Sequence, residues 1–197
     1  MKMIALLASL LLAGTALAGV VPGDAAPDFT LNDTAGHPHT LSALLKEGKT
    51  VVLEWFNPDC PFIVKNHKTF PVMNETFAPY ADRNVAWLAI NSGAAGKQGA
   101  ALARNVEAVT EYAMPFPVLL DPTGTVGKAY GAKTTPHMFI VTPDGKVAYV
   151  GAIDDTKDPG KRGEVNYVTA ALDALLAGKP VATAETAPYG CGVKYAD

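Results

Sequence analysis

Cysteine is scarce in this chain, which has two among its 197 residues, Cys60 and Cys191. A single domain of this length buries roughly 70% of the surface that its extended chain exposes, so its core needs neither a disulfide lattice nor a structural metal. The two cysteines are therefore available for another purpose.

Charged residues are also few, at 18% of the chain, and the formal net charge is −3. The basic residues do not gather into a cluster. Without such a cluster we do not expect nucleic acid as a partner. Hydrophobic residues make up 49% of the sequence but are spread along it, and no internal repeat is visible. This composition excludes a multi-pass membrane protein, a disordered acidic chain and a collagen-like repeat, and it indicates one globular domain.

The N-terminus has the pattern of a secretory signal peptide. Lys2 precedes an apolar run over residues 3–12, and the small-x-small sequence at residues 16–18 provides a cleavage site. The alternative is an uncleaved anchor, but the run is shorter than the roughly 20 residues that a membrane span needs. We therefore predict a signal peptide at residues 1–18, a mature chain without a membrane span, and a periplasmic or extracellular location. That setting is oxidising, so a pair of cysteines can form a disulfide there.

Hydrophobic periodicity predicts an α/β domain over residues 19–178. The expected strands cover residues 29–31, 50–56, 85–90, 117–120, 138–141 and 146–150. The expected helices cover residues 41–45, 61–80 with a bend at Pro71, 97–113, a brief segment that ends near residue 130, and 164–177. The turn at residues 142–145 makes the last two strands an antiparallel hairpin. Periodicity disappears in the tail, residues 179–197, which we expect to be either mobile or draped over the domain.

Cys60 follows a buried strand and precedes Pro61, which suits the first turn of a helix. The positive end of that helix and its unpaired amides would both favour a thiolate. We expect this sulfur to lie near the surface. The alternative is an inert buried cysteine.

The strand that leads to Cys60 and Pro61, the segment 134–137 before a later strand, and the hairpin after it resemble the thioredoxin superfold. The resemblance covers residues 26–176, and its opening and hairpin are most similar to the redoxin group, which includes the alkyl hydroperoxide reductase and thiol-specific antioxidant proteins. The end of the chain, residues 189–195, looks like the tail of a peroxiredoxin-like subgroup. The resemblance implies a central mixed sheet flanked by helices, here with a C-terminal extension.

The resemblance also implies roles for residues around the sulfur. Pro136 matches a proline that is cis and faces the reactive cysteine, leaving neighbouring backbone free to pair with an extended substrate; the alternative is an ordinary trans proline. Glu54 lies six residues before Cys60, at the offset of a buried acid that relays protons. The alternative for Glu54 is a partly solvated strand carboxylate. The residues expected to contact the substrate are Pro61, Thr135 and Asn57.

Two departures separate this chain from the standard mechanisms. Ile63 stands where a Cys-x-x-Cys protein has its second cysteine, so a vicinal disulfide cannot form. A Pro-x-x-x-Thr-x-x-Cys peroxiredoxin motif would need threonine and proline where Asn57 and Leu53 stand. Without that pair, the alignment of a hydroperoxide beside the sulfur must come from other groups.

Cys191 is the candidate for the missing second thiol. Flanked by two glycines, it is able to resolve a sulfenic acid or mixed disulfide at Cys60. The sequence separation does not forbid this pairing, because closure entropy grows only with the logarithm of loop length. The alternative is a permanent disulfide staple that ties the tail to the domain.

We therefore predict an exported thiol oxidoreductase that reduces hydroperoxides or exchanges disulfides. It would need no cofactor, because nothing in the sequence resembles a flavin or nicotinamide site, and its electrons would come from an external thiol protein. One alternative is a copper-binding or copper-delivery protein that uses Cys60, His67 and His137. Another is a redox-inert scaffold with a structural disulfide.

Overall fold

The computed structural model describes residues 19–196, so the predicted signal peptide at residues 1–18 lies outside the described part of the chain. A seven-stranded sheet with the order β2-β1-β5-β4-β3-β7-β8 forms the centre. Its strands are β1 (Thr30–Asp33), β2 (Pro38–Thr40), β3 (Thr50–Trp55), β4 (Val85–Asn91), β5 (Val118–Leu120), β7 (Met138–Val141) and β8 (Val147–Gly151). Two short strands, β6 (Thr134–Thr135) and β9 (Cys191–Gly192), pair separately.

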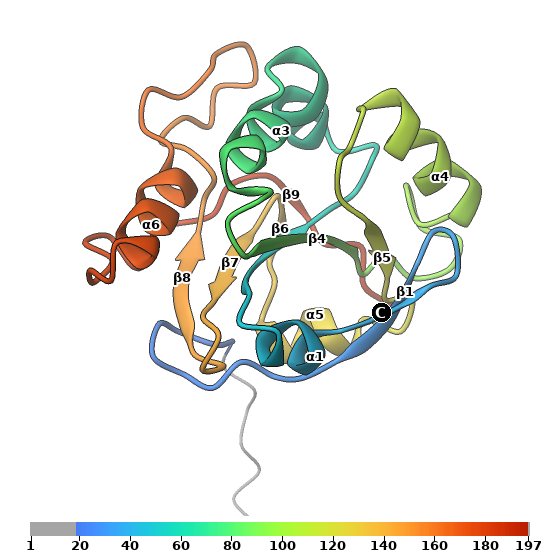
Figure 1. Ribbon diagram of the computed structural model, residues 1–197. Coiled ribbons are helices and arrows are strands. Elements are labelled where there is room, and N and C mark those ends of the chain that lie inside the picture. The colour runs from blue at the N-terminus through green and yellow to red at the C-terminus, as the bar shows by residue number, and fades with distance from the viewer. Residues whose placement is uncertain (1–18, 197) are drawn as a thin grey trace, which may run out of the picture.

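Helices cover both faces of this sheet, with α1 and α5 on one face and α3, α4 and α6 on the other (Figure 1). They are α1 (Leu41–Lys46), α2 (Pro61–Val64), α3 (Val72–Phe77), α4 (Leu102–Glu111), α5 (Thr125–Tyr130) and α6 (Tyr167–Leu176). A π-helical turn, Lys65–Thr69, continues α2, and a 3-10 turn, Ala78–Tyr80, continues α3. Across residues 19–196, none of these helices has the length and apolarity to cross a membrane.

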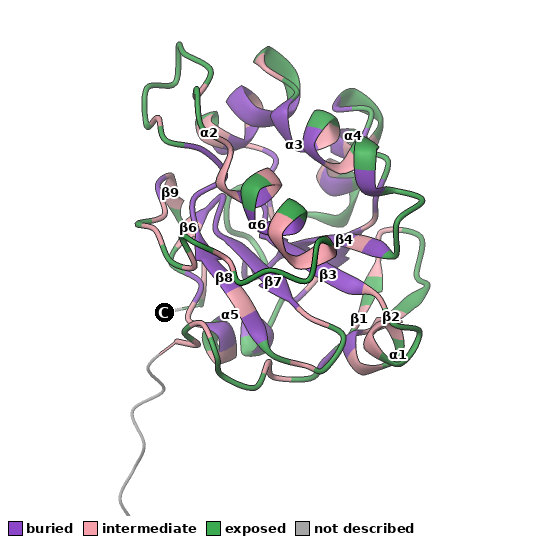
Figure 2. Ribbon diagram, turned by 60° about the vertical axis from the view of Figure 1, so that its left-hand side comes forward, coloured by how far each residue is buried: buried purple, intermediate pink, exposed green. Residues whose placement is uncertain are grey.

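The central strand β3 is buried along its whole length because both of its faces are covered (Figure 2). It runs parallel to β4 and antiparallel to β7, so the sheet is mixed, as predicted. Successive side chains of a strand point to opposite faces. Val51 and Trp55 accordingly join the apolar cluster with α1 and α5, whereas Val52 and Phe56 join the cluster with α3, α4 and α6. Glu54 points to the same face of the sheet as Val52 and Phe56, so its carboxylate lies inside the domain.

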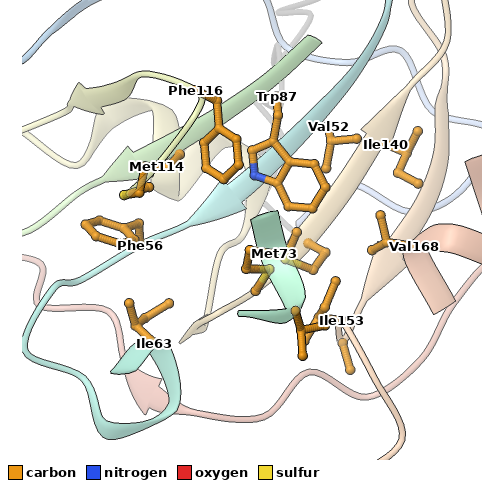
Figure 3. Packing of buried hydrophobic residues seen from close by; sticks show 14 of the residues in the cluster. Val52, Phe56, Ile63, Met73, Trp87, Met114, Phe116, Ile140, Ile153 and Val168 are labelled. Carbon is orange, nitrogen blue, oxygen red and sulfur yellow. The ribbon is translucent and has the colours of Figure 1, made fainter. Parts of the chain in front are cut away.

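The cluster on that second face is rich in large side chains (Figure 3). Trp87 and Phe116 stack with ring centroids 5.2 Å apart, and Met73, Ile153 and Val168 are almost completely buried in the same cluster. Each large apolar side chain buried in this way stabilises the fold by ~1.5–3 kcal/mol. The cluster also keeps water away from the polar groups that it surrounds.

Three expected helices differ in extent from the prediction. The helix expected at residues 61–80 consists of four short pieces, and Pro71, which has no amide hydrogen to continue the ladder, separates the π-helical turn from α3. The helix expected from residue 97 begins at Leu102, because Gly96 and Gly99 have positive φ angles of 79° and 72° that end any helical run there. The last helix begins at Tyr167, where the side chain of Asn166 accepts a hydrogen bond from the Thr169 amide.

The tail, residues 179–197 of the sequence, is packed against the domain over its described part. It passes β8, where the Val150 amide donates to Ala184 O at 3.0 Å and the Thr186 amide donates to Val150 O at 3.0 Å. It then continues as β9 beside β6 (Figure 1). Of the two arrangements that the sequence left open, the structure has the draped one.

Candidate active site

Cys60 is the residue that precedes α2, at the end of the loop that follows β3. Its carbonyl accepts hydrogen bonds from the amides of Ile63 and Val64 at 2.9 and 3.0 Å, and Pro61 is the first helical residue. The Sγ atom donates to Thr135 O at 2.9 Å. The expectation of a sulfur near the surface is wrong: the Cys60 side chain is 2% exposed, because the strands β6 and β9 lie against it.

The peptide bond between Thr135 and Pro136 is cis, as the resemblance predicted. Both residues are buried, and Thr135 pairs with Cys191 across the β6–β9 ladder. The Thr135 hydroxyl donates to Cys191 O at 3.4 Å. Thr135 therefore contacts Cys60 through its carbonyl and Cys191 through the ladder, and this brings the two cysteines together.

Cys191 is a half-buried thiol, and neither cysteine is in a disulfide in the structure. Burial raises the pKa of Cys191 to about 11, with a hydrogen bond and charge interaction from Cys60 adding to the shift. Cys191 is consequently protonated at neutral pH while Cys60 is reduced. The hydrogen bond and the charge interaction from Cys60 change when Cys60 is oxidised or forms a disulfide. The pKa of Cys191 therefore depends on the chemical state of Cys60.

Glu54 is fully buried, rather than partly solvated, and both of its oxygens are occupied. His67 Nε2 lies 2.7 Å from Glu54 Oε1, and Trp87 Nε1 donates to Glu54 Oε2 at 3.0 Å. The His67 ring stacks on Tyr112 with 5.7 Å between the centroids. The alternative metal site would have placed His67 beside Cys60, but the π-helical turn directs it to Glu54. Glu54 and His67 thus form a hydrogen-bonded pair inside the domain.

His137 follows the cis proline and is also buried, with Nδ1 accepting from the Lys133 amide at 3.3 Å. Burial, and secondarily the charge of Lys133, lowers its pKa to about 4. The alternative metal site of Cys60, His67 and His137 is wrong for residues 19–196, where no group of three or more His, Cys, Asp or Glu side chains is placed to hold a metal ion. His67 is bound to Glu54, while the His137 ring packs on Phe139 at 4.4 Å.

The depressed pKa of His137 predicts acid sensitivity. The unfolded chain takes up a proton on this imidazole below about pH 6.5, whereas the folded chain does so only near pH 4. The free energy of unfolding should therefore fall as the pH is lowered through that window, by roughly 3 kcal/mol in total. Urea unfolding as a function of pH should show that His137→Gln removes this part of the slope, while His37→Gln, whose side chain is 76% exposed, keeps it. Equal slopes in the two variants would contradict the prediction.

Asn57, expected to contact the substrate, is buried and holds a loop. Its Nδ2 donates to Gln98 O at 3.1 Å, and its Oδ1 accepts from the Asp59 amide at 3.0 Å. A Cβ on Gly99 would lie 2.0 Å from this oxygen, so the loop reaches Asn57 only because a glycine stands there. Pro61, by contrast, is exposed next to Cys60.

A buried polar network beside the tail was not foreseen from the sequence. Lys65 is 1% exposed; its ammonium donates to Thr156 O at 2.9 Å and lies 3.6 Å from Asp154 Oδ2. The Tyr189 hydroxyl donates to Asp154 Oδ1, and burial together with this bond raises the pKa of the phenol. The ammonium also lies 5.1 Å from the centre of the Tyr189 ring. The tail motif at residues 189–195 was the only signal that pointed to this region.

Tyr195 fixes the other end of the same motif. Its hydroxyl donates to Ala132 O at 2.9 Å, and the Lys128 ammonium lies 5.6 Å from the ring centre. A Cβ on Gly124 or Gly127 would come within 2.6 or 2.5 Å of the Tyr195 side chain, so these two glycines of the α5 region make room for the ring.

Known proteins share this arrangement of elements and sequence. A model of the AhpC/TSA family matches residues 22–150. Thiol-disulfide oxidoreductase ResA of Geobacillus thermodenitrificans is 31% identical over 144 residues, which cover 73% of this chain and 76% of that protein. A hypothetical protein from Sinorhizobium meliloti has a structure with a TM-score of 0.81 and 32% identity, covering 91% of this chain and 97% of the other.

A putative thiol:disulfide interchange protein DsbE from Chlorobium tepidum gives a TM-score of 0.56 with 28% identity, covering 67% of this chain and 85% of the other. These similarities confirm the predicted resemblance and the mixed α/β architecture. The chain has the thioredoxin fold and belongs to the AhpC/TSA family.

Proposed function

We propose that this protein is an exported thiol oxidoreductase in which Cys60 is the nucleophile and Cys191 is the resolving thiol. The observation that carries the proposal is the position of Thr135, whose carbonyl accepts from Cys60 Sγ at 2.9 Å while its backbone pairs with Cys191. A tail cysteine held at this point is placed to exchange with the first sulfur. The export rests on the predicted signal peptide at residues 1–18, and the oxidising compartment beyond the membrane suits this chemistry.

Disulfide exchange is the reaction that the site supports best. The Cys60 thiolate attacks one sulfur of a substrate disulfide, and a mixed disulfide forms as the first thiolate leaves. Cys191 then attacks Cys60 Sγ, the second substrate thiolate leaves, and the Cys60–Cys191 bond takes the place of two thiols. The substrate has gained two electrons, which an external thiol reductant must restore to the cysteine pair. ResA of Geobacillus thermodenitrificans, at 31% identity, is named a thiol-disulfide oxidoreductase.

The pKa of Cys191 gives these steps an order. While Cys60 is reduced, burial and the interaction with Cys60 keep the pKa of Cys191 at about 11, so Cys191 is a poor nucleophile. In a mixed disulfide Cys60 has neither a thiol hydrogen nor a thiolate to interact with Cys191, so this contribution is removed, while burial, the largest cause, still raises the pKa of Cys191. Cys191 therefore becomes easier to ionise after the first step has occurred.

Hydroperoxide reduction is the second candidate, favoured by the AhpC/TSA family match. Here Cys60 attacks the terminal peroxide oxygen, the alcohol leaves, and Cys191 condenses with the resulting sulfenic acid as water is released. Against it, Asn57 stands at the position of the usual threonine and its side chain is bound to Gln98 and Asp59. Donors to align the peroxide would have to come from elsewhere in the site.

Trapping experiments test the pairing of the two cysteines. The reduced protein is mixed with one equivalent of a small disulfide or of hydrogen peroxide, quenched with acid, alkylated and mapped by mass spectrometry. We expect a Cys60–Cys191 disulfide that a thiol buffer reduces again. A bond that resists every ordinary thiol would instead identify a structural staple, and two cysteines that stay alkylatable would exclude the proposed reaction. Faster oxidation by the small disulfide would favour disulfide exchange, and faster oxidation by hydrogen peroxide would favour peroxide reduction.

A further inference from the structure

We propose that the tail fills the strand edge next to Cys60 and thereby restricts this sulfur to small oxidants, excluding extended polypeptides. The inference rests on the proposed function and names its substrate class. A free strand edge beside a nucleophile is a docking site for an extended chain, because backbone hydrogen bonds give affinity for any sequence. In this protein the chain itself takes that edge.

The occupation of the edge is continuous. Within the β6–β9 ladder, Thr134 pairs with Gly192 and Thr135 with Cys191. Beyond the ladder the Val193 amide donates to Lys133 O at 3.1 Å. An incoming polypeptide would have to break these contacts before it met the backbone of Thr134 and Thr135.

Gly190 brings the tail unusually close to the site. Its φ is +138°, and a Cβ at this position would lie 2.1 Å from Thr135 O, the atom that accepts the Cys60 hydrogen bond. Any residue other than glycine would collide with that carbonyl. The tail backbone therefore lies directly over the group that Cys60 contacts, which accounts for the 2% exposure of the sulfur-bearing side chain.

Anchors on both sides hold this segment in place. Tyr189, 8% exposed, is bound through its hydroxyl to Asp154, which also faces the buried Lys65 ammonium. On the far side the Tyr195 hydroxyl donates to Ala132 O, and the Ala94 amide donates to Lys194 O at 2.8 Å. Displacing the whole strand means releasing both tyrosines, whereas a small molecule needs only a local opening of the tail around Cys191, with both tyrosines still in place.

Two probes that share the same leaving group distinguish the entry of a small molecule from the entry of an extended peptide. Both are mixed disulfides of thionitrobenzoate, one with cysteamine and the other with the cysteine of an extended ten-residue peptide. Attack by the Cys60 thiolate releases the coloured thionitrobenzoate anion and leaves the carrier on Cys60. Cys191 then displaces the carrier as a free thiol and forms the Cys60–Cys191 disulfide. The rate of colour release reports the first step alone, so slow resolution does not disturb it.

We expect the wild-type protein to react with the cysteamine probe at least about tenfold faster than with the peptide, after correction for the rates of both probes with free cysteine. Tyr189→Phe and Tyr195→Phe each remove one anchoring hydroxyl and keep the ring. Loss of a buried hydrogen bond, above all one to a charged group, changes an opening equilibrium by on the order of tenfold. The peptide rate should rise by that factor in Tyr189→Phe, and by less in Tyr195→Phe, while the cysteamine rate stays within about twofold.

Tyr80→Phe is the matched control. It removes a tyrosine hydroxyl that also donates to a carboxylate, Asp173 at 2.7 Å, on a helix that does not contribute to the β6–β9 ladder. The ratio of the cysteamine-probe rate to the peptide-probe rate should be the same in Tyr80→Phe as in the wild type. Amide hydrogen exchange at Cys191 and Gly192 shows in the same samples whether the tail opens more often.

Equal corrected rates of the two probes with wild-type protein would overturn the proposal. So would tyrosine variants in which hydrogen exchange shows an opened tail but the ratio of rates is unchanged. If neither probe reacts with the wild type, the proposed function itself fails, and this inference fails with it.

Discussion

Replacement of Cys60 by serine is expected to abolish disulfide and peroxide turnover, with a loss on the order of 10³-fold or more, because a hydroxyl is no substitute for a thiolate nucleophile. Cys191→Ser should behave differently. Its first step should proceed at the wild-type rate, and the protein should then stop as a mixed disulfide or sulfenic acid on Cys60. Single-turnover kinetics with mass spectrometry of the intact protein distinguish the two results.

The pair of variants also assigns the order of attack. Should Cys191→Ser lose the first step and Cys60→Ser retain it, the roles of the two sulfurs would be reversed. A Cys60→Ser protein that keeps more than a tenth of the turnover would exclude Cys60 as the nucleophile. Circular dichroism of both variants provides the control for folding, because each change replaces a single sulfur atom with oxygen.

Asp154→Ala is expected to lower the free energy of unfolding by about 3–5 kcal/mol, since it leaves the Lys65 ammonium as an uncompensated buried charge. It also removes the acceptor of the Tyr189 hydroxyl. Asp173→Ala provides the comparison, because Asp173 accepts a hydrogen bond from Tyr80 at 2.7 Å but is itself exposed. That variant should lose less than about 1 kcal/mol.

Urea denaturation of the reduced proteins measures both values. A similar small loss in the two variants would mean that Lys65 reaches water or another partner when Asp154 is absent. Lys65→Met in the Asp154→Ala background should restore part of the stability, because it removes the unpaired charge and keeps an apolar stem of similar length.

Local sequence patterns were sufficient for the middle of the domain. The run of apolar and β-branched residues in β3 predicted a buried central strand, and the strand is buried. The helix predicted to begin at Pro61, directly after Cys60, begins there. The cis proline at Pro136 came from the family resemblance, with no signal in composition or periodicity. The strand and the junction at Cys60 depend on neighbours in the chain, which is why local patterns were enough to predict them.

The environment of the site depends on contacts between distant segments. Cys60 is buried because a tail without periodicity forms a two-residue strand, and so short a strand leaves no pattern to detect. The family resemblance implied that Glu54 is a buried acid, but local sequence left a partly solvated strand carboxylate as the alternative. Its burial is possible because His67 and Trp87 supply partners from other elements. The strand β2, three residues long and begun by a proline, was missed for the same reason as β9.

The π-helical turn after α2 needs its exact number of residues, because the side chains on both sides of it must reach buried partners. Lys65, Asn66 and His67 are consecutive, and all three are buried, which is a wider inward face than one turn of an α-helix offers. The widened turn lets Lys65 reach Asp154 on one side while His67 reaches Glu54 on the other. Loss of a single residue here would tighten the spiral and rotate one of these side chains away by about 100°. The turn thus acts as a spacer that serves two buried polar contacts at once, and a deletion there disrupts the alignment of at least one of them.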